Sequence, residues 1–205
     1  MSISRRHLLL GLSAMLAGCT AQTSSQLANY GPRPDEKHPM PAMPLEKVKP
    51  ELRRQEVAYA TEQAPGTIVV DTPARRLYYV LGAGRAMRYG IGVGREGYAL
   101  AGNAYVGRKA EWPSWTPTPN MIRRDPQKNL KYAGGLPGGL TNPLGARAIY
   151  LYRGGNDTMF RIHGTNQPWS IGQAMSSGCV RMLNHDVIDL YERVKPGTKV
   201  VVLQA

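Results

Sequence analysis

Short β-rich runs separated by turn residues fill most of the chain from residue 56 onward. Val, Ile, Leu and Tyr are concentrated in these runs, whereas Pro, Gly and Asp stand between them. We expect strands at residues 57–59, 67–70, 76–81, 87–93, 146–152, 158–162 and 199–203. Because the runs are regularly spaced and long helical periods are rare, the pattern predicts a mainly β fold of the sandwich or barrel type.

A single helix is expected near the C-terminal end of the sequence. Asn184 is a candidate N-cap, and Pro196-Gly197 supplies a stop signal. The residues between them repeat with helical spacing and form one apolar stripe, which consists of Val187, Ile188, Tyr191 and Val194. The pattern therefore predicts one C-terminal helix just before the last strand.

Residues 112–145 interrupt the strand pattern with a long segment that resists regular structure. Prolines are frequent in its first eight residues, and Gly134-Gly135 and Gly138-Gly139 follow later. Long irregular loops inside compact domains are more often functional lids than accidents, although a passive surface excursion is the alternative. Trp112, Trp115 and Met121 favour the lid, because large apolar side chains need something to cover.

The N-terminal residues 1–18 have the pattern of an export signal. Arg5-Arg6 precedes an apolar run, Leu8–Leu16, that is too short to span a bilayer. Small residues then lead to Cys19, and Leu16-Ala17-Gly18-Cys19 is similar to the lipobox of bacterial lipoproteins, in which the cysteine is lipidated. The alternative is a buried N-terminal helix. We expect an exported lipoprotein on the periplasmic face of the cell envelope, anchored to a membrane through Cys19.

Residues 19–50 look like a tether, and residues 51–205 like one folded domain. Six prolines lie between Pro32 and Pro50, and apolar periodicity is weak. Such a segment is expected to bury too little apolar surface to offset its ordering entropy. It would then act as a semi-extended spacer between a membrane and the domain.

The chain carries a formal net charge of +12, from 26 Lys and Arg against 14 Asp and Glu. Removing residues 1–18 takes away Arg5 and Arg6, which leaves 24 basic residues and a net charge of +10. This charge favours an anionic partner. Export and the lack of a recognition motif argue against nucleic acid. A carboxylate-rich polymer outside the cytoplasm suits the charge better, although it could also serve solubility alone.

The residues with most chemical meaning are His163 and Cys179, which lie sixteen positions apart, each beside a glycine. The only other cysteine, Cys19, belongs to the export signal, so a disulfide is not expected. A thiol near a general base indicates nucleophilic catalysis. Gly178 allows a tight turn before the thiol. The backbone N–H groups of Gly178 and Cys179, with Ser177, could then form an oxyanion hole.

Arg181 follows Cys179 by two positions, and alternate residues of an extended segment share one face. Its guanidinium could therefore bind a substrate carboxylate and also favour the thiolate. The alternative is a solvated surface arginine.

Other interpretations of the same residues fit the sequence less well. A buried His and Cys could be core packing. A metal site would need more ligands than His185, since no Cys-x-x-Cys or His-x-x-x-His spacing occurs, so neither metal nor cofactor is expected. A papain-like protease has the opposite order of Cys and His. The group that orients His163 stays open between a backbone carbonyl and one of three carboxylates, Asp157, Asp186 and Asp189.

Over residues 55–205 the sequence resembles the L,D-transpeptidase (YkuD-type) catalytic domain of bacterial cell-wall enzymes. The family signature is a histidine, about fifteen residues, then Ser/Thr-His-Gly-Cys and an arginine two positions later. The matching residues are His163-Gly164-Thr165-Asn166, Ile171-Gly172, Ser176-Ser177-Gly178-Cys179, Arg181 and, upstream, Asn142-Pro143-Leu144-Gly145. Ser177 replaces the second histidine of the signature. Activity is expected to survive this change, because the upstream histidine is the general base of the family.

The resemblance implies a β-sandwich-like fold and an acyltransferase that acts in two steps on peptidoglycan stem peptides. Cys179 would form a thioester with loss of D-alanine, His163 would be the base, and the carbonyl of Gly164 would orient its imidazole. Arg181 would hold a donor carboxylate. Two further residues, Asn166 and Trp169, would help to shape the pocket.

The sequence does not identify the acceptor that attacks the thioester. A stem-peptide amine, an outer-membrane protein and water all fit, which gives a cross-linking enzyme, a protein-anchoring enzyme or a hydrolase. A wall-binding lipoprotein without catalysis is the remaining alternative, although a binder needs no thiol. Each of these would take part in cell-wall biogenesis and cell shape.

Overall fold

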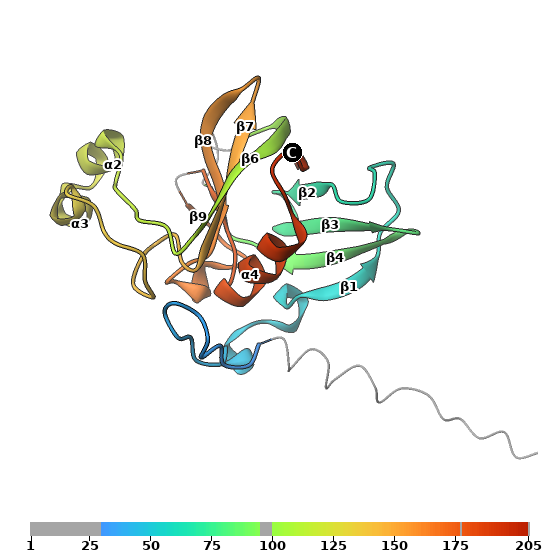
Figure 1. The fold of residues 1–205 in the computed structure, drawn as a ribbon, viewed down its shortest axis with the longest axis horizontal. Helices are drawn as coiled ribbons and strands as arrows, with labels where there is room; N and C mark the ends of the chain where they lie inside the picture. Colours follow the sequence, from blue (N-terminus) through green and yellow to red (C-terminus); the bar gives the residue numbers. More distant parts are fainter. Residues whose placement is uncertain (1–29, 95–99, 177, 205) are drawn as a thin grey trace, which may run out of the picture.

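The computed structural model describes residues 30–94, 100–176 and 178–204, and within them eleven strands form two sheets (Figure 1). The strands are β1 Gln55–Ala58, β2 Ile68–Asp71, β3 Arg76–Gly82, β4 Arg85–Gly90, β5 Val93–Gly94, β6 Gly102–Glu111, β7 Arg147–Arg153, β8 Asn156–His163, β9 Ala174–Ser176, β10 Val180–Arg181 and β11 Lys199–Leu203. Nine of them form one sheet in the order β1-β4-β3-β2-β11-β6-β7-β8-β10, and β5 pairs with β9.

The last strand joins the two halves of the large sheet. β11 runs parallel to β2 and antiparallel to β6. The β1–β4 half and the β6–β8 half lie at different inclinations (Figure 1), and side chains from both halves enter one core, with Leu77 from the first half and Ile149 from the second. Val187 and Leu190 of helix α4 (Asn184–Arg193) close this core. The prediction of a mainly β fold with one C-terminal helix after the site is confirmed.

The predicted strands are present, except that the run 87–93 is divided between β4 and β5, which belong to different sheets. The sequence pattern missed β6, the longest strand, and the short strands β9 and β10. Only Ala104 and Val106 of β6 are buried, so its apolar alternation is short. A register shift between Val106 and Arg108 then breaks the alternation at Gly107. Gly107 is needed there, because a Cβ atom would lie 2.0 Å from the Tyr152 ring. A strand with so few apolar positions and a bulge gives a weak signal.

The lid, residues 112–145, is less irregular than expected. It contains the short helices α2 (Pro119–Arg124) and α3 (Pro126–Asn129) and the 3-10 turn η3 (Leu130–Tyr132), which project from the sheet in Figure 1. Each helix begins with proline after a capping side chain, Thr118 or Asp125, that accepts a bond from a backbone N–H. These local caps explain why a Pro-rich segment still forms helical turns.

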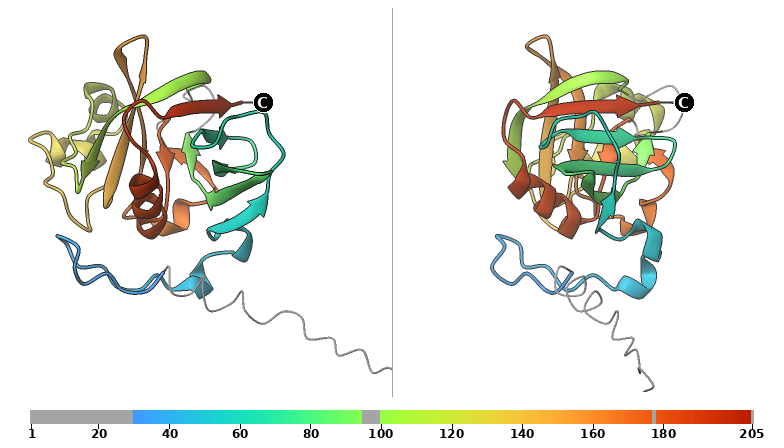
Figure 2. Two further views of the ribbon diagram at one scale, coloured as in Figure 1. Left: turned by 45° about the vertical axis from the view of Figure 1, so that its right-hand side comes forward. Right: turned by 90° about the vertical axis from the view of Figure 1, so that its right-hand side faces the viewer.

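The described part of the predicted tether, residues 30–50, packs against the domain, so the expectation of an extended spacer is wrong for these residues. It contains η1 (Leu45–Lys47), and η2 (Pro50–Leu52) continues it toward β1. Tyr30 and Val48 are buried in a small core with Leu183. Figure 2 shows this segment, in blue, running along the side of the domain next to α4. Burial of Tyr30, Met40 and Val48, together with an ion pair between Glu36 and Arg147, outweighs a composition that suggests disorder.

The predictions for the export signal and for Cys19 lie outside the described residues, as does the tether before residue 30. Among the residues that the structure describes, no helix is long and apolar enough to cross a membrane.

Candidate active site

The site is built on a parallel pair of strands. β10 lies beside β8 with Val180 opposite Ile162 and Arg181 opposite His163. Ile162 and Val180 belong to the main core. Since alternate residues of a strand point to opposite faces, His163 and Arg181 lie together on the other face. Cys179 comes one residue before β10, where the register continued by one position places it opposite Arg161, two positions before His163.

A backbone carbonyl orients the imidazole of His163. Nδ1 of His163 lies 2.6 Å from the carbonyl oxygen of Gly164. A carbonyl only accepts, so Nδ1 donates the proton and Nε2 keeps its lone pair as the basic atom. The carboxylate alternatives for this role are wrong, because each has cationic partners elsewhere: Asp157 pairs with Arg161, Asp186 with Arg54, and Asp189 with Arg54 and Arg193.

Asn184 holds the turn that carries this carbonyl. It is the first residue of α4 and not its cap, which corrects the prediction from sequence. Its Oδ1 accepts from the backbone N–H of Ala146 at 3.0 Å and of Thr165 at 3.1 Å. A Cβ on either Gly145 or Gly164 would lie 2.2 Å from this oxygen. Gly145, Gly164 and Asn184 are therefore closely packed next to His163, and a larger residue at either glycine would displace the asparagine side chain.

Cys179 lies beside an irregular part of β8. Its Sγ is 3.9 Å from the carbonyl oxygen of Met159. The register with β7 shifts between Tyr150 and Tyr152, and Met159 has a φ of 64° within this irregularity. Bulges of this kind turn side chains toward a site. Here the bulge brings strand β8 close to a half-buried thiol.

Burial controls the protonation of both groups. It raises the pKa of the Cys179 thiol, although a backbone hydrogen bond from Arg161 and the charges of Arg161 and Arg181 act in the opposite direction. Burial lowers the pKa of His163 to about 4, with the bond to Gly164 opposing and the two arginines adding to the shift. Near neutral pH the resting pair is therefore an uncharged thiol and an uncharged imidazole.

Arg161 is a functional candidate that sequence reasoning missed. It lies on the same face of β8 as His163, two residues earlier, and Asp157 fixes its guanidinium at 2.8 Å. Its charge acts on both Cys179 and His163. The alternation along the strand that ends in His163 is the signal that could have found it.

Glycines let the cysteine segment lie against β5. The backbone of Arg181 exchanges two hydrogen bonds with Gly92, at 2.8 and 2.9 Å. A Cβ on Gly94 would lie 2.6 Å from the Cα of Gly178, so these two segments of the chain contact each other through their backbones. Gly178 has a φ of 126°, which favours glycine. The backbone bends at Gly178, where the sequence led us to expect a tight turn. Ser177 lies outside the described residues, and the oxyanion hole stays a prediction.

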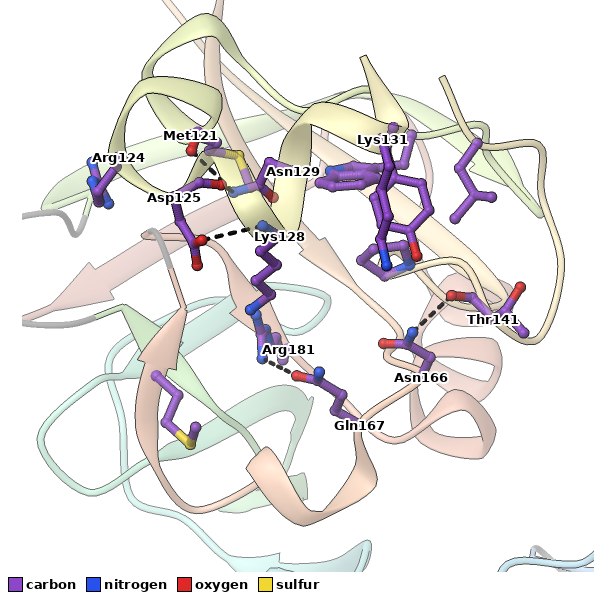
Figure 3. Close-up of a pocket in the computed structure, with 15 residues that line it drawn as sticks. Met121, Arg124, Asp125, Lys128, Asn129, Lys131, Thr141, Asn166, Gln167 and Arg181 are labelled. Carbon is purple, nitrogen blue, oxygen red and sulfur yellow. Dashed lines mark hydrogen bonds between the residues drawn. The ribbon is translucent and has the colours of Figure 1, made fainter. Parts of the chain in front are cut away.

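A cavity of about 560 Å³ opens between the lid and the site (Figure 3). Arg181 and Asn166 line it. Asn166 donates to the carbonyl of Thr141 at 2.7 Å, which ties the loop after His163 to the lid, and Arg181 donates to Gln167 Oε1 at 3.3 Å. Trp169 is 63% exposed and lies outside this lining. The cavity meets the predicted catalytic pair through Arg181, since His163 and Cys179 do not line it either.

The described residues contain no group of three or more His, Cys, Asp or Glu side chains that could hold a metal ion.

A mainly β domain with histidine and cysteine on adjacent parallel segments agrees with the family resemblance of the sequence. The chain belongs to the family of L,D-transpeptidase catalytic domains (YkuD), whose model matches residues 65–202. The probable L,D-transpeptidase ErfK/SrfK of Escherichia coli is 37% identical over 139 residues, which are 66% of this chain and 43% of that protein. The probable L,D-transpeptidase YcfS of Escherichia coli is 32% identical over 164 residues, 78% of this chain and 48% of that protein. The chain thus spans less than half the length of either relative.

A solved structure from Brucella melitensis is also similar. It is described as a probable carnitine operon oxidoreductase, CaiA, and is 50% identical to this chain. The match covers 78% of this chain and 99% of that one, with a TM-score of 0.52. The likeness supports a shared fold. The family of this chain follows from the matched domain, and the oxidoreductase name is that of the Brucella protein.

Proposed function

We propose that this chain is a cysteine-dependent L,D-transpeptidase that acts on peptidoglycan stem peptides through a thioester. The observation that carries the proposal is the pairing of β10 with β8, in which Arg181 lies opposite His163 and Cys179 precedes Arg181 by two positions. Membership of the family supports the reaction class. The net charge of +12 suits an anionic cell-wall polymer.

In the first step, Sγ of Cys179 attacks the carbonyl carbon of the third residue of a stem tetrapeptide. Nε2 of His163 takes the thiol proton as the C–S bond forms. The C–N bond to D-alanine then breaks, and its amine leaves with the proton from His163. In the second step an acceptor amine attacks the thioester and gives its proton to His163. The C–S bond breaks, and the proton returns to the sulfur.

The electrostatics of the site fit this sequence. A neutral imidazole can accept a proton, and Nδ1 stays bound to the Gly164 carbonyl while it does so. Arg161 and Arg181 place positive charge next to the sulfur, which stabilises the thiolate as it forms. Arg181 faces the cavity and can hold a carboxylate of the donor.

The decisive experiment is intact-mass spectrometry of the protein incubated with a tetrapeptide donor. The wild-type chain should gain the mass of an acyl tripeptide, and Cys179→Ala should gain nothing. A normal adduct on Cys179→Ala would rule out Cys179 as the nucleophile. Analysis of the released products identifies the acceptor, because joined muropeptides indicate cross-linking, a peptide linked to a protein indicates anchoring, and trimmed peptides alone indicate hydrolysis.

We also propose that the protein is exported and anchored on the periplasmic face of the envelope through a lipid on Cys19. The basic n-region, the short apolar run and the small residues before Cys19 support this. Metabolic labelling with an alkyne fatty acid tests it. Label is expected on the wild-type protein and is expected to be lost in Cys19→Ser, while an equally labelled Cys19→Ser variant would contradict the anchor.

A further inference from the structure

The cavity under the lid carries more positive than negative charge. Arg124, Lys128, Lys131 and Arg181 line it, against one acidic residue, Asp125. Oδ1 of Asp125 already accepts from the backbone N–H of Lys128 at the start of α3. A concave surface with this balance attracts anions, and its walls concentrate the field.

Two of these cations come from opposite sides of the cavity. Figure 3 shows the Lys128 side chain extending from the lid helix α3 toward Arg181. Arg181 comes from β10, and its hydrogen-bond partner is the neutral Gln167, at 3.3 Å. Among the described residues, no Asp or Glu forms an ion pair with either cation. Arg181 is partly buried, and this burial lowers the pKa of its guanidinium. An anion between the two side chains would compensate both charges.

Part of the remaining wall is apolar and is held in place by contacts within the lid. Trp115 and Tyr132 meet edge to face, with centroids 5.8 Å apart, and the Trp115 backbone pairs with Leu136. The side chain of Asn142 donates to the carbonyls of Pro113, Leu136 and Pro137, which fastens both ends of the lid together. The wall therefore suits an aliphatic peptide segment, next to a pair of cations that suits a carboxylate.

The geometry points to Lys128 as a specificity residue of the lid, which binds one carboxylate of the donor peptide jointly with Arg181. This inference rests on the proposed function for the identity of the peptide. It assigns the lid a part in choosing carboxylate-bearing donors over amidated ones. Lys128 would strengthen binding by direct charge pairing, without any contact to the predicted nucleophile.

The test measures peptide binding in the Cys179→Ala background, where no acyl transfer is expected to complicate it. Three tetrapeptides serve as probes: one in which the C-terminal and the diamino-acid carboxylates are free, one amidated at its C-terminus and one amidated on the diamino-acid side chain. Tryptophan fluorescence reports binding, because Trp115 lies in the wall. Lys128→Gln should weaken binding of the free peptide about five-fold, as expected for an exposed ion pair, and should reduce its salt dependence. Lys195→Gln, an exposed lysine after α4, is the matched control and should bind normally.

The amidated peptides show which carboxylate is bound. Amidation of that group should remove the difference between Lys128→Gln and the control, whereas amidation of the other group should leave it intact. Equal binding of the free peptide by Lys128→Gln and Lys195→Gln would overturn the inference. The proposed function fails separately, namely if the wild-type chain forms no adduct at Cys179 with any of the three peptides.

Discussion

Glu36 and Arg147 form a two-pronged ion pair, with Nη1 3.0 Å from Oε2 and Nη2 2.8 Å from Oε1. The indole N–H of Trp112 donates to the same Oε2 at 2.9 Å. Arg147 is the first residue of β7, and its carbonyl accepts from the backbone N–H of Gly164. One carboxylate from the N-terminal segment thus connects the start of the lid with the turn that orients His163.

Glu36→Gln is expected to destabilise the protein markedly. Arg147 has only 8% of its side chain exposed, so the substitution leaves a buried cation without its main partner. Glu111 stays 3.9 Å away, which keeps the expected loss near the low end for buried pairs, about 3 kcal/mol. Urea unfolding measures it. The control is Glu56→Gln, which breaks an exposed pair with Arg85 and should cost less than about 1 kcal/mol. Equal losses of unfolding free energy in the two variants would show that the buried Glu36 pair stabilises the fold no more than the exposed Glu56 pair.

Asn184→Ala is expected to lower both stability and the rate of acylation. The backbone N–H groups of Ala146 and Thr165 lose their acceptor, at a cost on the order of 1–3 kcal/mol each. Gly164 then loses the group that packs against it, and its carbonyl no longer fixes the imidazole. Asn184→Asp keeps an acceptor oxygen and should retain most activity. Mass spectrometry of adduct formation over time gives the rate, and a fully active Asn184→Ala would contradict this positioning role.

His163 should make the protein sensitive to acid. The pKa of its imidazole is lowered from 6.5 to about 4 by burial, so between these values the unfolded chain binds more protons than the folded one. The stability contributed by neutral His163 is complete above pH 6.5 and is lost as the pH falls through 4, in total about 3 kcal/mol. Urea unfolding near neutral pH and at the acid end of this range should show a smaller loss for His163→Gln than for the wild type. His185, whose pKa burial also lowers, leaves a residual loss with the same sign in both proteins. An unchanged acid sensitivity in His163→Gln would contradict the assignment.

Asp186 is expected to have the opposite effect on the pH dependence. Burial raises the pKa of this fully buried carboxyl from 3.8 to about 7, and Arg54, 4.0 Å away, offsets only part of the shift. The folded state therefore binds the extra proton, and stability is lost as the pH rises from 3.8 through 7. Asp186→Asn removes the buried charge, so its melting temperature should exceed that of the wild type above pH 7 and match it near pH 4.

Asp189 provides the contrast on the same helix. It pairs with Arg54 at 3.1 Å and with Arg193 at 2.9 Å, and it accepts from the Tyr89 hydroxyl at 2.5 Å. Although burial raises its pKa, these partners outweigh burial and hold the pKa below its usual value. Asp189→Asn should therefore lower the melting temperature at neutral pH. A gain in stability from both substitutions would show that the two carboxylates do not differ as proposed.

The sequence determined what depends on neighbours along the chain. Runs of β-branched and aromatic residues predicted all but one of the long strands, and the stripe from Val187 to Val194 predicted α4. The spacing of His163, Gly178, Cys179 and Arg181 indicated the family and the candidate catalytic chemistry. These features survive folding because strand alternation and helical period are local properties of the backbone.

Only the tertiary structure decided the roles that join distant residues. Glu36 and Arg147 are 111 positions apart in the sequence, so the composition around Glu36 suggested only a spacer. Asn184 accepts from Ala146, 38 positions away, whereas the local pattern suggested that Asn184 caps a helix. The role proposed for Lys128 depends on the lid, which places this residue in the same cavity as Arg181. The physical reason is the same in each case: burial and charge compensation depend on which side chains meet after folding, and a linear pattern does not contain those contacts.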